Sequence, residues 1–224
     1  MRDLLVIHED NHLLVVNKPA GLLVQGDRSG DVTLLDVAGR YLKEKFNKSG
    51  NVYLGLVHRL DRNVSGVVLL AKTSKAAGRM STQFRDKTVL KTYLAVTERP
   101  LPGSEGELRD WLAAKGDARG VTRAQGTAFD GGKESLLRYR TLDLKNGRAL
   151  VEVVPVTGRR HQIRAQLALA GSPLLGDVKY GAAAGLPRHR IALHAWKLAV
   201  RHPVTGQELE FIADPPEGWP WHLA

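Results

Sequence analysis

One carboxylate stands between two arginines in the stretch GLVHRLDRNVSG, which runs from Gly55 to Gly66. The acid is Asp61, and its charged neighbours are Arg59 and Arg62. Nearby arginines favour the ionised form of a carboxylate and lower its pKa by roughly 1–3. An ionised carboxylate suits a nucleophile or a general base, whereas a general acid must carry a proton. Asp61 is therefore a candidate catalytic residue, and an ion-paired loop aspartate is the alternative.

The neighbourhood of Asp61 argues against two other kinds of site. A second acid is missing nearby, so the stretch does not supply the two carboxylates of a glycosidase. His58 precedes Asp61 by three residues, and His-x-x-Asp could be half of a metal site. However, no second histidine follows at a ligand spacing. We therefore expect His58 to pack or to form hydrogen bonds, and we expect no metal.

A second cationic stretch, TGRRHQIRAQ, runs from Thr157 to Gln166 and predicts a helix capped by Thr157 and ended by Gly171. In that helix Arg160 and Arg164 share one face, and Arg159 and His161 lie in the first turn. The positive end of a helix dipole adds to such cations, so this end suits a phosphate or carboxylate. A solvated helix face is the equally simple alternative.

Arg164 differs from the other cations because it neighbours Ile163, near the apolar face of the predicted helix. A buried arginine needs a carboxylate partner. Asp61 would serve as that partner.

An aromatic residue accompanies a cation in the predicted strand KTYLAV. Lys91, Tyr93 and Ala95 share one face of this strand, since side chains alternate. An aromatic ring can stack on a nucleic-acid base, which is worth about 1–3 kcal/mol per base. A core tyrosine is the alternative for Tyr93.

The overall composition limits the classes of function. The chain has 224 residues, of which 43% are hydrophobic, and this is enough for a folded core. Its net charge of +10 favours a polyanionic partner such as nucleic acid. It has no cysteine, which excludes disulfides and thiolate metal sites. The N-terminal sequence predicts neither a signal peptide nor a membrane span, so we expect a cytoplasmic, soluble protein without a membrane partner.

The elements that must position these residues mix strands and helices. We expect a helix capped by Thr33, with Asp36 completing a capping box, and a helix capped by Ser74, with Ala77, Met80 and Phe84 facing inward. The first should end near Ser49 and Gly50. Strands are expected at 4–9, 12–18, 54–57, 66–72, 91–99, 135–144, 149–156 and within 191–211. The segment 103–133 has weak patterning and predicts an irregular, mobile or partner-binding region. The mixture favours an α+β fold with a mostly antiparallel sheet, in a single domain over residues 1–224.

Several stretches of the chain can be taken together, in the order HRLDRNVSG, VVLLAKT, KTYLAV, TGRRHQIRAQLALAGSPLLGDVKYG, and IALHAWKL with HPVTG. These stretches closely resemble the RluA-type pseudouridine synthase family. NKPAGLLV is similar to the first motif of that family, and the resemblance spans about Asn17 to Phe211. It implies isomerisation of uridine to pseudouridine in structured RNA, without cofactor or metal. It also implies a mixed, largely antiparallel sheet that carries the active cleft.

The resemblance also implies roles for individual residues. Asp61 corresponds to the essential acid, Tyr93 to the tyrosine that packs on the target base, and Arg164 to the basic residue that pairs with the aspartate. Arg59 corresponds to an arginine that helps to evict the target nucleotide from its helix. The expected RNA-binding residues are Arg59, Arg62, Lys91, Arg160 and His161.

Two positions depart from the family pattern. Val64 stands where threonine is common, which removes one hydroxyl, and Gln166 stands where histidine is frequent, which could alter RNA contacts. The chain begins close to the first motif, so no separate N-terminal RNA-binding module is expected. By analogy with the family, large-subunit ribosomal RNA is the first expected substrate and transfer RNA the second, and a monomer is expected.

Two other readings compete with catalysis on RNA. The first is an RNA-binding protein that has lost catalysis, but such a protein would discard Asp61, Tyr93 or Arg164, and all three are present. The second is a metal-dependent nuclease, which needs clustered His, Asp or Glu ligands that the sequence does not supply.

Overall fold

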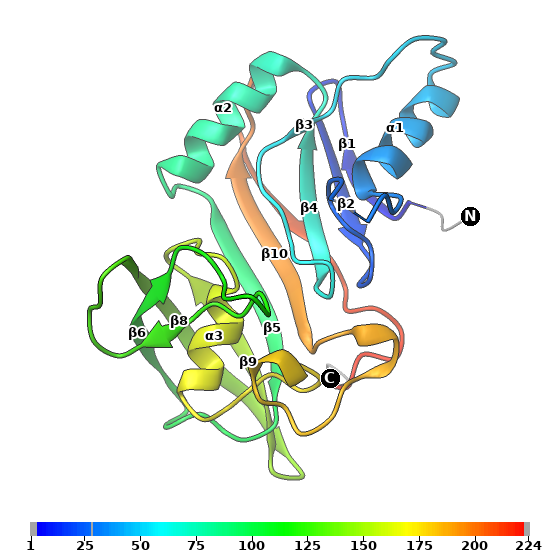
Figure 1. Ribbon diagram of the computed structural model, residues 1–224. Helices are drawn as coiled ribbons and strands as arrows, with labels where there is room; N and C mark the ends of the chain where they lie inside the picture. Colours follow the sequence, from blue (N-terminus) through cyan, green and yellow to red (C-terminus); the bar gives the residue numbers. More distant parts are fainter. Residues whose placement is uncertain (1–3, 28, 222–224) are drawn as a thin grey trace. The chain divides into compact units, whose positions relative to one another are not determined.

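The computed structural model describes residues 4–27 and 29–221, and within them the chain forms two compact units. The described residues up to Leu90, with Ala195–Pro216, make the first unit. Lys91–His194, with the described residues from Glu217 onward, make the second. Figure 1 shows strands and helices in both, and the α+β prediction is confirmed. None of the described helices is long and apolar enough to cross a membrane.

The first unit is built on a sheet whose pairings β1–β2, β2–β4, β3–β4 and β10–β11 are antiparallel. Its strand order is β1-β2-β4-β10, with β11 paired to β10 and β3 paired to β4. All seven residues of β4 are buried, so this central strand is covered on both faces. The predicted strands around the loop of Asp61 are therefore present. Their bounds are β1 Val6–Glu9, β2 Leu13–Lys18, β3 Gly55–Leu56, β4 Ser65–Ala71, β10 Leu193–Arg201 and β11 Glu208–Ile212.

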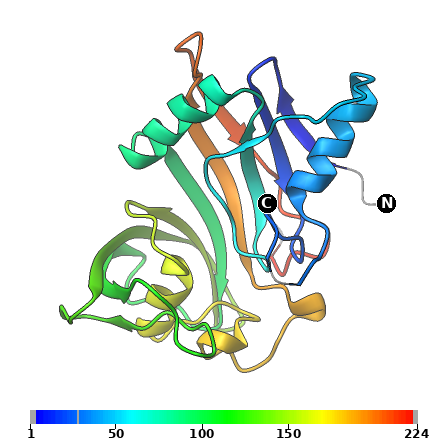
Figure 2. The same ribbon diagram turned by 45° about the horizontal axis from the view of Figure 1, so that its top comes forward.

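Two helices accompany this sheet, as Figures 1 and 2 show. Helix α2, Ser74–Arg85, contacts β3 and β4, and its buried Met80 packs with Leu13 and Val67 in one apolar core. Thr73, not Ser74, caps this helix. The buried face of the helix therefore starts one residue earlier than predicted, because Ala76 is buried and Ala77 is only partly buried.

Helix α1, Leu34–Lys45, lies beside the β1–β2 end of the sheet in both views. The predicted capping box is present, since the Thr33 side chain accepts from the Asp36 N–H and the Asp36 carboxylate accepts from the Thr33 N–H. The helix ends four residues before the predicted stop at Ser49. Phe46 already caps it and is exposed, because the apolar face is complete at Leu42.

The second unit holds a five-stranded antiparallel sheet in the order β5-β9-β8-β6-β7. The prediction of an irregular segment over 103–133 is wrong, because β6 pairs with β8 along nine residues of it. Its outward side chains are charged, and Glu107 forms an ion pair with Arg138 directly across the ladder, at 2.7 Å. The strand bounds are β5 Leu90–Thr97, β6 Glu105–Ala113, β7 Ala124–Gln125, β8 Gly132–Lys145 and β9 Arg148–Pro155.

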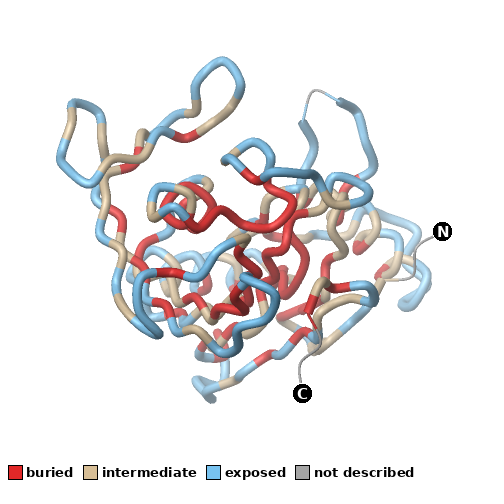
Figure 3. The backbone as a smooth tube through the Cα atoms, turned by 90° about the horizontal axis from the view of Figure 1, so that it is seen from below, coloured by how far each residue is buried: buried red, intermediate tan, exposed pale blue. Residues whose placement is uncertain are grey.

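Helix α3, Gln162–Leu169, packs on β6 and β7 of this unit and is shorter than predicted. It begins five residues after Thr157, with His161 at its N-cap in the left-handed region at φ 51°. Its end agrees with the prediction, since Gly171 follows with φ +80°. Two short 3-10 turns follow, η1 Val178–Tyr180 and η2 Pro187–His189. In Figure 3 the projecting loops are mainly exposed. In α3, the residues from Gln162 to Leu167 are buried.

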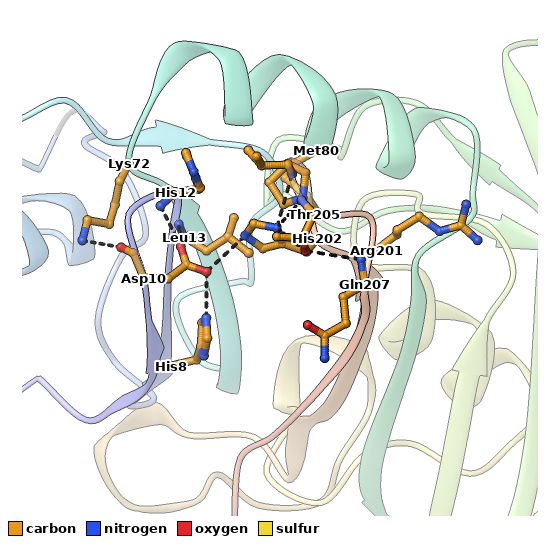
Figure 4. Close-up of polar contacts among 12 residues, drawn as sticks. His8, Asp10, His12, Leu13, Lys72, Met80, Arg201, His202, Thr205 and Gln207 are labelled. Atoms are coloured by element: carbon orange, nitrogen blue, oxygen red, sulfur yellow. Dashed lines mark hydrogen bonds and ion pairs between the residues drawn. The ribbon is translucent and has the colours of Figure 1, made fainter.

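A polar cluster around Asp10 joins the first turn of the chain to the β10–β11 hairpin, as Figure 4 shows. One carboxylate oxygen of Asp10 lies 3.0 Å from Nε2 of His8 and 3.1 Å from Nε2 of His202. The other oxygen accepts the N–H groups of His12 and Leu13, at 2.6 and 2.7 Å. One aspartate thus ties together segments about 190 residues apart in the sequence.

The hydrogen bonds of His202 fix its tautomer. Its Nδ1 accepts the backbone N–H of Thr205 at 2.9 Å, and a backbone N–H can only donate. The ring proton therefore sits on Nε2 and is donated to Asp10. This assigns the histidine of HPVTG, one of the stretches that carry the family resemblance, to holding the hairpin.

Replacing Asp10 with Asn should destabilise the protein by on the order of 1 kcal/mol at neutral pH, because the new amide NH₂ faces the Nε2–H of His202, and the partly exposed carboxylate is screened by solvent. Burial opposes ionisation of Asp10, but hydrogen bonds from His8, His12 and Leu13 outweigh it and lower its pKa to about 2. The stabilisation is therefore present above pH 4 and lost as the pH falls through 2. Urea unfolding of the wild type and Asp10→Asn at pH 6 and pH 2.5 measures this stabilisation. An equal loss of unfolding free energy in Asp10→Asn at both pH values would contradict the prediction.

Candidate active site

Asp61 lies on the loop between β3 and β4, at the end of the HRLD sequence. Its carbonyl accepts the N–H of Val64 at 3.1 Å, which closes a tight turn. Leu60 and Val64 are buried on either side of it, while Asp61 itself is partly exposed. The apolar neighbours anchor the loop, and the carboxylate is left at the protein surface.

A fully buried lysine, Lys18, binds this loop from the interior of the protein. Its Nζ donates to the carbonyl oxygens of Pro19, Leu22 and Arg62, at 3.0, 2.8 and 3.4 Å. A direct bond from the Gly21 N–H to the Arg62 carbonyl, at 2.7 Å, joins the same two loops. The loop of NKPAGLLV and the loop of Asp61 are therefore one hydrogen-bonded assembly.

The charge state of Lys18 is coupled to Asp61. Burial lowers the pKa of Lys18 to about 7, the negative charge of Asp61 opposes that lowering, and Arg62 adds to it. Lys18 was not among the residues selected from the sequence. The signal available was its position, at the end of a buried strand and directly before Pro19.

The two arginines beside Asp61 differ in their surroundings. Arg59 is exposed. Arg62 pairs with Asp31 at 2.8 Å and donates from Nε to the Gly21 carbonyl at 3.2 Å, and its side chain is about half exposed. Arg62 thus helps to hold the loop, while Arg59 presents its charge to solvent.

Gly66, the last residue of the motif, lies where β4 runs close to β10. It has φ +120°, and a Cβ there would overlap the backbone of Ala195. Only glycine fits such an approach at positive φ. This glycine therefore allows β4, the strand that follows Asp61, to pack closely against β10.

His58 is a structural residue, as predicted. Its Nε2 accepts the N–H of Leu69 at 2.9 Å, and its ring stacks on Phe84 with centroids 4.6 Å apart. Among residues 4–27 and 29–221, no group of three or more His, Cys, Asp or Glu side chains is placed to hold a metal ion.

In the second unit, Tyr93 and Lys91 lie on β5 and are partly exposed. Tyr93 pairs with Val153 of β9. The Lys91 ammonium reaches the turn before α3, since a Cβ on Gly158 would lie 3.7 Å from its Nζ. The structure thus places the predicted Lys91 beside the TGRRH segment.

Arg164 is buried in α3, as predicted, and it has a carboxylate partner that the sequence analysis did not select. Its Nε and Nη2 donate to the two oxygens of Asp177 at 2.7 and 2.8 Å, and the side chains are 6% and 1% exposed. Asp177 belongs to the quoted stretch GDVKYG. The pairing of Arg164 with Asp61 stays a prediction.

The other cations of TGRRHQIR do not share a helical face with Arg164. Arg160 precedes α3 and is exposed, and its guanidinium lies close to Gly116, where a Cβ would also overlap the backbone of Gly120. His161 caps the helix, and its Nδ1 lies 2.8 Å from the Tyr180 hydroxyl. The prediction of one cationic helix face is therefore wrong, because the helix begins only at Gln162.

The two departures from the family pattern both lie inside the protein. Val64 is 2% exposed, where a methyl group suits the apolar surroundings. Gln166 is fully buried and donates to the Leu108 carbonyl at 2.9 Å and to Asp110 at 2.7 Å. Gln166 therefore joins α3 to β6, and an RNA contact is not available to it.

Comparisons with known proteins identify the family of the chain. The model of a family described as RNA pseudouridylate synthase matches residues 12–169. Ribosomal large subunit pseudouridine synthase C of Rickettsia conorii is 36% identical over 214 residues, or 94% of this chain and 68% of that protein. Dual-specificity RNA pseudouridine synthase RluA of Haemophilus influenzae is 35% identical over 211 residues, or 93% of this chain and 91% of that protein.

A solved structure shares the fold. Human RNA pseudouridylate synthase domain containing 4 aligns with a TM-score of 0.79 and 27% identity, over 96% of this chain and 90% of that one. The family match spans both units and more than half of the chain. The chain therefore belongs to the RNA pseudouridylate synthase family, in its RluA-type branch, and is an isomerase of RNA uridine.

Proposed function

We propose that this protein converts specific uridines of large-subunit ribosomal RNA to pseudouridine, with Asp61 as the catalytic carboxylate. The substrate class rests on one observation, which is the alignment of 94% of the chain with a relative named for the ribosomal large subunit. The family match crosses the boundary between the two units, which supports their acting as a single catalytic domain. We further propose that it acts as a monomer in the cytoplasm.

The reaction balances without a partner reagent. The bond from C1′ of the sugar to N1 of the base breaks, the base turns, and C1′ bonds to C5. The hydrogen on C5 leaves as a proton, and N1 gains one. No electron is gained or lost, so the proposed reaction needs a carboxylate, a base pocket and phosphate contacts, and no cofactor.

Asp61 suits the role of the carboxylate because its loop is fixed from within by Lys18, while the acid itself reaches the surface. A rigidly held loop limits the geometries that the carboxylate can adopt, which favours a reaction that requires alignment. Three routes remain possible for a carboxylate, namely attack on the sugar, addition to the base, and removal of a sugar proton.

The remaining predicted residues take roles in holding RNA. A uridine in folded RNA must be flipped out before it can react, at a cost of a few kcal/mol. Phosphate contacts from Arg59, Arg62, Lys91, Arg160 and His161 offset that cost. Tyr93 packs on the flipped base, and Arg164 pairs with Asp61.

The test is release of tritium from RNA carrying the label at uridine C5. The purified protein is incubated with unmodified large-subunit ribosomal RNA, small-subunit ribosomal RNA and transfer RNA in parallel. We expect release from the large-subunit RNA at one or a few mapped positions. Release from transfer RNA alone would reassign the substrate. Binding to RNA without release from any of the three would favour the alternative of a protein that has lost catalysis.

Removal of metal ions should leave the reaction intact. With EDTA in excess, and the RNA kept folded by monovalent salt or polyamine, the rate of tritium release should stay close to that of the untreated enzyme. RNA folding is checked in the same buffer by native gel mobility. A loss of release that returns on adding Zn²⁺, with the RNA still folded, would contradict the proposed metal-free mechanism.

A further inference from the structure

The segment Gly176–Gly181 wraps around the guanidinium of Arg164. A short 3-10 turn, η1, follows Asp177, whose carbonyl accepts the N–H of Tyr180 at 2.9 Å. In a 3-10 turn, residues three apart lie on the same side. The turn therefore directs Asp177 and Tyr180 toward the same partner, and both contact Arg164.

Asp177 holds one edge of the guanidinium. The two bonds, at 2.7 and 2.8 Å, form the bidentate pair that matches the planar fork of arginine to a carboxylate. Both side chains are almost fully buried. An ion pair in such a place contributes little net stability, so orientation of the arginine is the more telling consequence.

Tyr180 holds the face of the same group. The Arg164 Cζ lies 4.8 Å from the centroid of the Tyr180 ring, which is within the range of a cation–π contact. With one edge and one face fixed by the same segment, the guanidinium has a single orientation relative to α3.

The Tyr180 hydroxyl extends this arrangement to the loop 114–123, between β6 and β7. It accepts the N–H of Thr122 at 2.8 Å and shares a hydrogen bond of 2.8 Å with Nδ1 of His161. The loop is itself ordered, since the Asp117 carboxylate accepts the N–H of Val121 at 2.8 Å. One tyrosine therefore contacts Arg164 with its ring and a surface loop with its hydroxyl.

We propose that Asp177 and Tyr180 are positioning residues of the isomerisation, and that they act through Arg164. Asp177 and the Tyr180 ring set the orientation of the guanidinium, while the Tyr180 hydroxyl fixes the loop 114–123 against the RNA-binding His161. This inference rests on the proposed function, in which Arg164 works with Asp61.

The first test is Asp177→Asn, which keeps the size of the side chain and removes its charge. A misplaced guanidinium lowers the rate of a bound substrate, so kcat should fall by about 10²-fold with KM little changed. The matched control is Asp110→Asn. Asp110 also holds α3, through Gln166, and that variant should keep its kcat. Thermal unfolding of each variant shows that it is folded.

A double-mutant cycle separates positioning from general stability. If Asp177 acts through Arg164, the loss caused by Asp177→Asn should disappear in an Arg164→Lys background. If the two substitutions act independently, the kcat of the double variant falls by the product of the two single-variant factors. That result would overturn the inference. Single-turnover tritium release keeps slow variants measurable.

Two substitutions of Tyr180 divide its functions. Tyr180→Phe keeps the ring and loses the hydroxyl, so KM should rise about three- to tenfold with kcat retained. Tyr180→Leu removes the ring and should lower kcat. An equal fall of kcat in both would overturn the division of roles.

Failure of this inference is distinct from failure of the proposed function. Wild-type protein that releases no tritium would remove the proposed function and the inference together, whereas Arg164→Lys with an unchanged rate would remove the role proposed for Arg164 and the inference that rests on it. A severe loss in Arg164→Lys, with Asp177→Asn and Tyr180→Leu folded and fully active, would remove the inference alone.

Discussion

Asp61→Ala should abolish pseudouridine formation while the variant still binds RNA. Loss of the carboxylate that performs the chemistry lowers turnover by about 10⁴-fold or more. Affinity for RNA should hold or rise slightly, because a negative charge leaves a surface that contacts phosphates. Tritium release measures turnover, and filter binding of the same RNA measures affinity.

The matched control is Asp27→Ala, which removes an exposed carboxylate from the loop that leads to α1. It should release tritium at the wild-type rate. Equal release by Asp61→Ala and the wild type would remove Asp61 from the chemistry. A variant that no longer binds RNA would show that Asp61 contributes to binding, against the division of roles proposed here.

Lys18→Met should weaken the fold and loosen the loop that carries Asp61. Methionine fills a similar volume, but three backbone carbonyls lose their donor, and buried unsatisfied acceptors cost about 1–3 kcal/mol each. Relief from burying a charge offsets part of this, so we expect a net loss of about 2–3 kcal/mol in the free energy of unfolding. Because Lys18 also fixes the loop of Asp61 from within, kcat of the folded variant should fall as well.

The pH dependence of this deficit follows from the lowered pKa of Lys18. The folded value of about 7 lies below the usual 10.5, so between these values the unfolded chain binds the extra proton. Stability due to this group therefore rises with pH across that window. In urea unfolding, the difference in unfolding free energy between the wild type and Lys18→Met should increase from pH 7 to 9.5. A difference that decreases would contradict the assigned direction.

The sequence located the elements better than the contacts between them. Strands and caps depend on neighbouring residues, which is why the capping box of Thr33 and the strands beside Asp61 could be predicted. Strand β6 was missed because its outward side chains are charged, and its ladder depends on partners such as Arg138 far along the chain. Charge alternation carries a weaker signal than apolar alternation.

The candidate site shows the same limit. Asp61 was recognisable from its arginine neighbours and its motif. Lys18 bonds to backbone carbonyl groups, which every residue has, so its residue type does not reveal its partners. Asp177 bonds to a partner thirteen residues away. Arg160 was placed on α3 because the rule of four-residue spacing cannot tell where a helix begins. Such positions become visible only when the tertiary contacts are known.

The division of the first unit between both ends of the chain bears on synthesis at the ribosome. Its core residues Leu13 and Val67 pack with Leu198 and Phe211, which are translated after the second unit's residues 91–194. The second unit, by contrast, is nearly continuous in sequence. We infer that residues 91–194 of the second unit can fold while the first unit still exposes an apolar sheet face, and that the turn at Asp10 waits for His202 to emerge. The nascent chain is therefore most prone to aggregation just before residues 195–216 appear.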